Sequence, residues 1–130
     1  MEKRNDNAFA LWLTITGLYM FVLLWGSLLP YVRQVEPPLW KVILHNSLHA
    51  PAYAGLTFLW AGTLRVMKFC RRVLGSALAI AVAYGALIEV LQGNVQGREP
   101  SVIDLAINLF GGLAAVYAIR RGWLRIGEKA

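Results

Sequence analysis

Four long runs of apolar residues follow one another along the chain, and short polar segments separate them. The runs cover residues 9–29, 48–64, 73–91 and 102–119. Each run is about 17 to 21 residues long, and at a helical rise of about 1.5 Å per residue this length crosses a hydrocarbon layer about 30 Å thick. The pattern predicts an all-α fold, a polytopic membrane protein built as a bundle of four transmembrane helices.

The first two runs are the least regular of the four. The first is too long for the apolar core of a signal peptide, and the Leu-Leu-Pro sequence at residues 28–30 is a poor cleavage site, so we expect this run to stay as a helix. The second run is short and carries His49 and Pro51 near its start, where a first-turn proline is tolerated. Because no internal repeat or long linker interrupts the chain, residues 1–130 are predicted to form a single transmembrane domain.

Composition favours a membrane environment. Hydrophobic residues make up 58% of the chain, whereas soluble domains typically contain about 45–50%. The formal net charge is +6, but the basic residues stand in short clusters between the apolar runs instead of on one polar face, so no nucleic-acid partner is predicted. The single cysteine, Cys70, has no second thiol with which to form a disulfide or a metal site.

The positions of Lys and Arg predict the orientation of the bundle. If the four runs cross the membrane in turn, one side holds Arg33, Lys41 and Arg98, and all the other Lys and Arg residues fall on the opposite side. Positively charged connecting segments stay in the cytoplasm. The sequence therefore predicts a multi-pass protein of the cell (inner) membrane with both termini in the cytoplasm. The cytoplasmic group is Lys3, Arg4, Arg65, Lys68, Arg71, Arg72, Arg120, Arg121, Arg125 and Lys129.

Polar residues that lipid disfavours gather on the predicted outer side. They come in pairs three or four residues apart, so each pair shares one face of its helix. An ionisable group inside a membrane is costly unless it faces other helices and finds partners there. The pairs should therefore converge and form a small polar cavity open to the outer leaflet. The pairs are His49 with Tyr53, Glu89 with Gln92, and Asp104 with Asn108.

The connection between the third and fourth runs contains a helix-start signal. Ser101 followed three residues later by Asp104 predicts an N-cap and the acidic residue of a capping box. Capping alone is an alternative role for Asp104, but it does not explain Asn108 one turn further on. Arg98 precedes this positive helix terminus and is suited to holding a phosphate or carboxylate, with a salt bridge to a nearby carboxylate as the alternative.

Three motifs in the last three runs carry a family resemblance: His49-x-x-x-Tyr53-x-x-Leu56, Tyr84-Gly85-x-x-x-Glu89-x-x-Gln92, and Arg98-x-x-Ser101-x-x-Asp104-x-x-x-Asn108-x-x-Gly111. With them the chain resembles the VanZ-like family of small integral membrane proteins over more than half of its length. The resemblance implies a multi-helix protein of the cell envelope, and the best-known member of the family is linked to resistance to the antibiotic teicoplanin. Family members often carry Asp-Lys four and three residues before the histidine, where this chain has His45-Asn46. No role of that pair is carried over.

The favoured hypothesis is a binding protein. Its polar cavity recognises the head group of a membrane lipid or of a lipid-linked cell-envelope precursor, and no bond is broken. By the family resemblance, such binding would modulate susceptibility to glycopeptide antibiotics. The predicted ligand-binding residues are Arg98, Asp104, Glu89 and His49, with Gln92, Asn108 and Tyr53 orienting them.

A membrane enzyme is the main alternative. A hydrolase or transferase acting on a phosphorylated lipid would use His49, Glu89 or Asp104 as general acid, general base or nucleophile. Arg98 would hold the phosphate. The chain contains no nucleophile elbow and no nucleotide-binding loop, so no catalytic residue is assigned.

Two further hypotheses remain open. A lipid transporter with only four helices would need to form a homo-oligomer. A metal site could use His45 and His49, which are one helical turn apart, together with Glu89 or Asp104. A lone pair of histidines is a weak signal, so neither a metal nor a cofactor is predicted.

Overall fold

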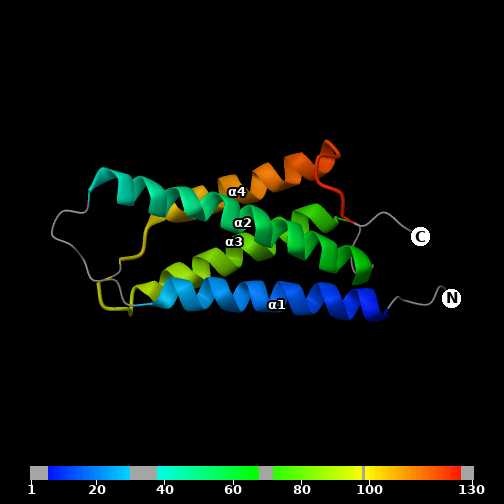
Figure 1. The fold of residues 1–130 in the computed structure, drawn as a ribbon, viewed down its shortest axis with the longest axis horizontal. Helices are drawn as coiled ribbons and strands as arrows, with labels where there is room; N and C mark the ends of the chain where they lie inside the picture. Colours follow the sequence, from blue (N-terminus) through cyan, green and yellow to red (C-terminus); the bar gives the residue numbers. More distant parts are fainter. Residues whose placement is uncertain (1–5, 30–37, 68–71, 98, 127–130) are drawn as a thin grey trace.

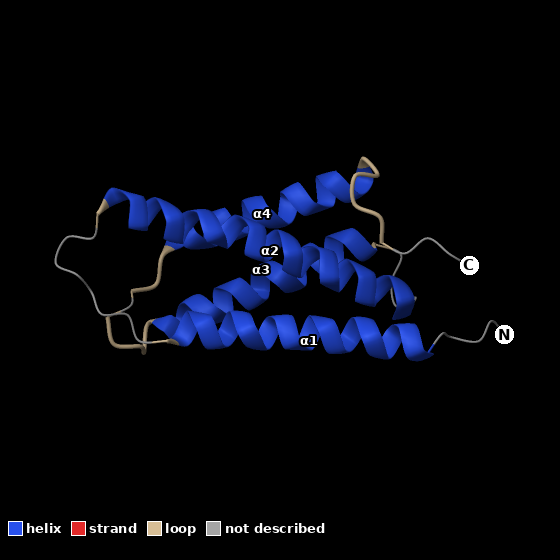
Figure 2. Ribbon diagram, viewed as in Figure 1, coloured by secondary structure: helices blue, strands red, loops and turns tan. Residues whose placement is uncertain are grey.

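The computed structural model describes residues 6–29, 38–67, 72–97 and 99–126, except for the side chains of residues 41, 42 and 44–46. The described residues form four α-helices and no strand, which confirms the predicted all-α fold (Figure 1 and Figure 2). The helices are α1 (Asp6–Leu28), α2 (Leu39–Met67), α3 (Val73–Gln92) and α4 (Val102–Arg120).

The helix boundaries agree with the apolar runs except at the start of α2. This helix begins at Leu39, directly after Pro38, and not at residue 48 as predicted. The polar residues that interrupt the apolar run between residues 41 and 47 lower its hydropathy but are compatible with helix, whereas Pro38 is a natural helix boundary. The expected first-turn position of Pro51 is therefore wrong, because this proline lies in the interior of α2.

The four helices pack as an antiparallel bundle in which α2 and α3 are central. Each of these two contacts all three of the other helices, whereas α1 and α4 lie on opposite sides and do not contact each other within the described residues (Figure 1). The start of α1, the end of α2, the start of α3 and the end of α4 lie at one end of the bundle. The end of α1, the start of α2, the end of α3 and the start of α4 lie at the other end.

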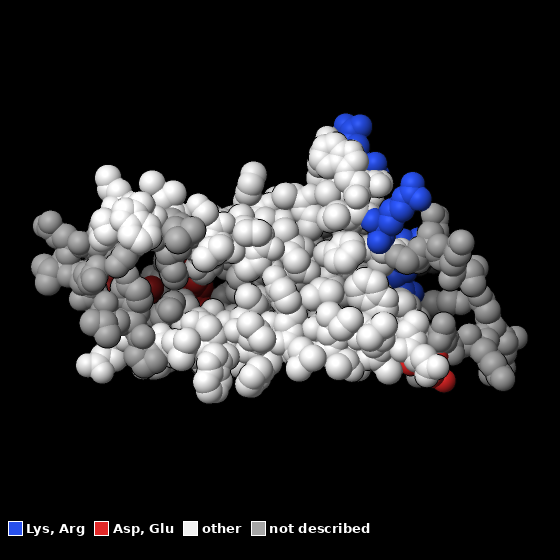
Figure 3. All heavy atoms as spheres, in the orientation of Figure 1, with Lys and Arg blue, Asp and Glu red and all other residues white. Residues whose placement is uncertain are grey.

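Helices α1, α3 and α4 are long and apolar enough to cross a membrane. Much of their apolar surface faces outward, and Val102, Phe110 and Leu18 are each more than half exposed. In Figure 3 the charged side chains lie toward the two ends, and the middle of the visible face carries none. Large apolar side chains that face outward along such helices suit a hydrocarbon environment.

Small residues bring the central helices together. Ala61 and Ala77 are fully buried in one apolar cluster, and Ala81 is buried in a second one with Tyr53 and Leu56. Without the hydrophobic effect to drive helices together in lipid, close backbone approach through small side chains supplies the van der Waals contact that holds such a bundle.

Candidate functional site

A group of polar side chains from α2, α3 and α4 meets at the end of the bundle where α3 ends and α4 begins. We call it the polar cluster, and its members are His49, Tyr53, Glu89, Ser101, Asp104 and Asn108. The predicted pairs supply most of these residues, and helical periodicity places each pair on the inward side of its helix. His49 bonds to Asn108, whereas Glu89 bonds to Ser101.

His49 and Asn108 form a polar contact between α2 and α4. The His49 Nδ1 atom lies 3.1 Å from Asn108 Oδ1. Asn108 is 1% exposed, and His49 is half-buried. The two residues are 59 positions apart in the sequence, so the helical spacing that predicted their direction could not predict that they pair.

A glycine on α3 makes room for this contact. A Cβ atom added at Gly85 would lie 2.9 Å from Tyr53 Cε1 and 3.1 Å from Asn108 Nδ2. Gly111, three residues after Asn108, faces the backbone of α2, where an added Cβ would overlap the carbonyl group of Ala50. Both glycines therefore let α2, α3 and α4 approach closely around Asn108.

The amide of Asn108 is only partly satisfied. Its Nδ2 atom is buried and has no hydrogen-bond partner among the residues that the structure describes. Rotating the amide by half a turn would exchange the atom that faces His49 but would leave the other polar atom without a partner. A buried donor in this state costs about 1–3 kcal/mol, and proteins rarely keep one without a reason.

Glu89 connects α3 to the start of α4. The residue is 7% exposed, and its Oε2 accepts a hydrogen bond of 2.9 Å from the backbone N–H of Ser101. The Ser101 hydroxyl in turn accepts a bond of 3.2 Å from the backbone N–H of Asp104, which confirms Ser101 as the N-cap. The expected capping box differs in one respect, because Glu89 and not Asp104 accepts from Ser101. A carboxylate at this position also stabilises the positive end of the helix.

The remaining predicted residues occupy different positions. Asp104 is half-buried, and within the described residues its carboxylate has no hydrogen-bond partner. Tyr53 is 4% exposed, with its hydroxyl in electrostatic range of Glu89. Gln92 is not part of the cluster. Its Nε2 atom donates to the carbonyl oxygen of Ser27 on α1 at 3.0 Å. Arg98 lies outside the described residues, so its predicted phosphate contact stays a prediction.

Two tyrosines that the sequence analysis did not select hold α1 beside this region. Tyr19 donates to the carbonyl oxygen of Ala52 at 2.8 Å, and Tyr84 donates to that of Met20 at 2.7 Å. Both pack against the apolar cluster that contains Tyr53. Tyr84 precedes Gly85 in one of the three motifs, and this position was the available signal for it.

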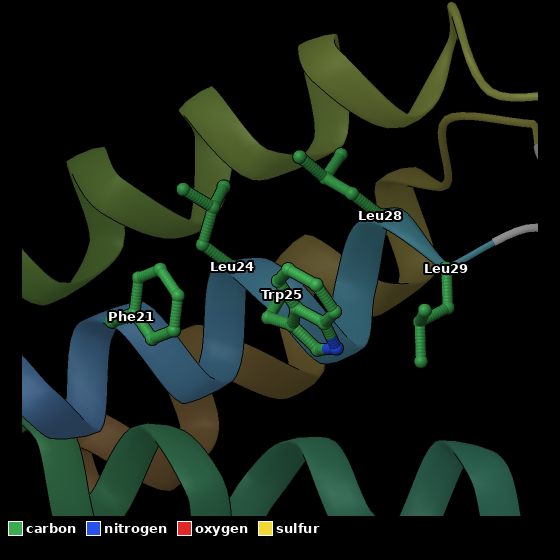
Figure 4. A pocket seen from close by; sticks show the side chains of 5 residues that line it. All are labelled: Phe21, Leu24, Trp25, Leu28 and Leu29. Carbon is green, nitrogen blue, oxygen red and sulfur yellow. The ribbon is translucent and has the colours of Figure 1, made fainter.

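A cavity of about 300 Å³ lies beside the C-terminal half of α1. Apolar side chains line it, and Figure 4 shows Leu24 and Leu28 pointing toward α3. None of its lining residues belongs to the polar cluster, so this cavity suits hydrocarbon and is not the predicted polar one. No group of three or more His, Cys, Asp or Glu residues that could hold a metal ion occurs in the described part of the chain.

These features define a small all-helical protein with helices that can cross a membrane and a polar cluster buried at one end. The sequence profile described as VanZ/LLP1 matches residues 3–125 of the 130-residue chain. The chain therefore belongs to the VanZ/LLP1 family, which confirms the resemblance seen in its motifs. Comparison with curated proteins and with solved structures finds no match.

Proposed function

We propose that this VanZ/LLP1 protein is a multi-pass protein of the cell (inner) membrane with both termini in the cytoplasm. In this proposal α2 crosses the membrane together with the three more apolar helices. Its contacts with all of them support this, because a helix that packs on three sides needs less apolar surface toward lipid. The described arginines support the orientation, since they lie at the end that holds the start of α1 and the end of α4 (Figure 3).

The polar cluster then faces the outside, and its proposed role is to bind the polar head group of a membrane lipid or of a lipid-linked envelope precursor. One observation carries this proposal: the Asn108 amide contacts His49 through Oδ1, and its buried Nδ2 donor has no partner among the described residues. A head-group oxygen would satisfy the donor and recover its desolvation cost. The effect on the cell would be a change in susceptibility to glycopeptide antibiotics.

The other groups suit a ligand that carries hydroxyl and phosphate groups. The Asp104 carboxylate, which has no partner among the described residues, can accept hydrogen bonds from sugar or glycerol hydroxyls. Arg98 precedes the N-terminus of α4 in the sequence and would hold a phosphate there. Glu89 is already bonded to Ser101 and so stabilises the site instead of binding the ligand.

The test compares the lipids that remain bound to purified protein. Wild type and Asn108→Leu are extracted in mild detergent, and their bound lipids are identified and quantified by mass spectrometry. Thr63→Val is the matched control, because Thr63 is equally buried but lies outside the cluster. We expect Asn108→Leu to retain about tenfold less of one head-group class, the effect of losing about one hydrogen bond. Equal retention in all three proteins would contradict the proposal.

A lipid-modifying enzyme is the second candidate. Asp104 favours it, because this residue is half-buried at the start of α4 and its carboxylate has no hydrogen-bond partner among the described residues. If Asp104 transfers protons, Asp104→Asn should keep the bound lipid and lose the cellular effect about 10²–10⁴-fold. If the protein only binds, lipid retention and the cellular effect should fall together. The comparison of these two readouts therefore separates the candidates.

A further inference from the structure

The end of the bundle opposite the polar cluster carries a second concentration of charge. Every Lys or Arg side chain that the structure describes lies there, and all of them are exposed (Figure 3). Within the described residues none of these side chains forms an ion pair. The group, which we call the arginine end, consists of Arg65, Arg72, Arg120, Arg121 and Arg125.

The segment that follows α4 has a defined path across the arginine end. The backbone turns at Gly122, where φ is +75°, and the N–H of Trp123 donates to the carbonyl oxygen of Ala118 at 2.9 Å. Ile126 is 4% exposed and packs into an apolar cluster of α2 and α3, and Arg65 Nη1 donates to its carbonyl oxygen at 3.3 Å. The segment is thus fixed at both of its ends.

This path presents aromatic rings beside the guanidinium groups. Trp123 is 72% exposed and meets Tyr117 edge-on, with the ring centroids 5.6 Å apart. The guanidinium carbon of Arg121 lies 5.2 Å from the centroid of the Tyr117 ring. An exposed indole near a guanidinium group combines the two features that position a protein at the head-group level of a membrane.

We infer that the arginine end binds anionic phospholipid head groups. Guanidinium groups bind phosphate oxygens through parallel hydrogen bonds, and Trp123 would insert at the level of the glycerol groups. Because α4 is long and apolar enough to cross a membrane, its C-terminal end reaches the membrane surface and not the bulk solution. This site lies at the opposite end from the polar cluster, so it does not depend on what that cluster binds.

The test uses the full-length protein in non-ionic detergent with two lipid probes. Dioleoylphosphatidylglycerol and dioleoylphosphatidylcholine are titrated separately, and bound lipid is counted by native mass spectrometry. We expect wild type to bind the phosphatidylglycerol at least tenfold more strongly. Each arginine near an anionic surface strengthens binding roughly fivefold, so the double variant Arg121→Gln with Arg125→Gln should lose most of this preference.

Three further samples sharpen the result. Arg33→Gln removes one charge from the segment that joins α1 to α2 and should keep the preference. Asn108→Leu should also keep it, which separates this site from the polar cluster. Trp123→Ala, which keeps all the charges, should weaken the binding of both lipids. Equal binding of the two lipids by wild type, or an unchanged preference in the double arginine variant, would overturn the inference.

Free phosphate shares the chemistry of the head group and must be distinguished from it. Inorganic phosphate is therefore added to the protein with bound phosphatidylglycerol. Its concentration equals the phosphatidylglycerol concentration that saturates binding. Retention of the bound lipid supports a lipid site, because the aromatic contact adds to the charge. Complete displacement would mean that the arginine end binds free phosphate, and the assignment to lipid would be wrong.

Discussion

Two of the polar contacts between helices are satisfied to different degrees. Between α1 and α2 the hydroxyls of Thr16 and Thr63 lie 2.9 Å apart, and both also reach backbone carbonyl oxygens within hydrogen-bond distance. Between α2 and α4 the contact of His49 with Asn108 leaves one amide nitrogen buried and without a partner. Thr16, Thr63 and Asn108 are almost fully removed from solvent, whereas His49 is half-buried.

In our proposal this difference distinguishes a packing contact from a ligand-binding site. The threonine hydroxyls meet their hydrogen-bonding capacity inside the bundle, so they need no further partner and serve to align α1 with α2. Asn108 keeps an unused donor at a place where water is excluded. Such a donor costs free energy in the protein alone, and a bound hydrogen-bond acceptor would recover that cost. Trp60 Nε1 is likewise buried without a partner among the described residues, but it lies against the apolar clusters and does not belong to the polar cluster.

Glycines accompany both contacts, but they face different neighbours. An added Cβ at Gly62 would meet the Trp12 side chain, which can move. An added Cβ at Gly111 would meet the backbone of α2 at Ala50, which cannot move without displacing the helix. The region around Asn108 is therefore the more rigid of the two, and this rigidity holds the amide in place.

The largest expected effect comes from breaking that rigidity. Gly111→Ala should force α2 and α4 apart and lower the free energy of unfolding by about 3 kcal/mol, the upper range for overpacking. Gly17→Ala is the control, because a Cβ there meets nothing within 4 Å, and it should be neutral or stabilise α1 by up to about 1 kcal/mol. Thermal unfolding in detergent measures both. Equal stabilities of the two variants would show that the α2–α4 approach is not tight.

A smaller effect is expected at the start of α4. Glu89→Gln keeps a hydrogen-bond acceptor but removes the negative charge from the helix terminus, so the free energy of unfolding should fall by about 0.5–1 kcal/mol. Ser101→Ala removes the N-cap acceptor and should cost about 1 kcal/mol. Chemical unfolding curves of the two variants check these values. No loss of stability in Glu89→Gln would mean that Glu89 has a role other than holding α4.

The smallest effect should come from the satisfied contact. Thr16→Val and Thr63→Val, made singly and together, form a double-mutant cycle whose coupling energy should be about 0.6 kcal/mol, the average for hydrogen bonds between membrane helices. Lipid retention should be unchanged in all three variants. A loss of bound lipid in any of them would contradict the proposal that the Thr16–Thr63 contact serves packing alone.

Helices α3 and α4 were predictable to within one residue, because their apolar runs end at strong local signals. Gly93 follows the last residue of α3, and Ser101 caps α4. The start of α2 was not predictable in this way. Hydropathy marks where lipid begins, whereas a helix can continue through polar residues until a boundary such as Pro38.

The sequence predicted which helix faces carry the residues of the polar cluster, but it did not predict which side chains form hydrogen bonds with one another. Spacing placed Asn108 and His49 on inward faces, yet the partner of each depends on how the helices rotate and approach. Gln92 shows the limit, because it shares a face with Glu89 but reaches back to Ser27 on α1. The roles of Gly85 and Gly111 also depend on contacts with residues far away in sequence, which spacing does not reveal.

The most direct test of the account asks whether the polar cluster and the arginine end lie on opposite sides of the membrane, with the cluster outside. Cys70 is the single cysteine, so Cys70→Ser gives a background without thiols. Asp104→Cys and Arg121→Cys are then added separately, and intact cells are treated with a membrane-impermeant maleimide. The account predicts labelling of the Asp104→Cys protein in intact cells and of the Arg121→Cys protein only after permeabilisation. The reverse pattern would contradict it.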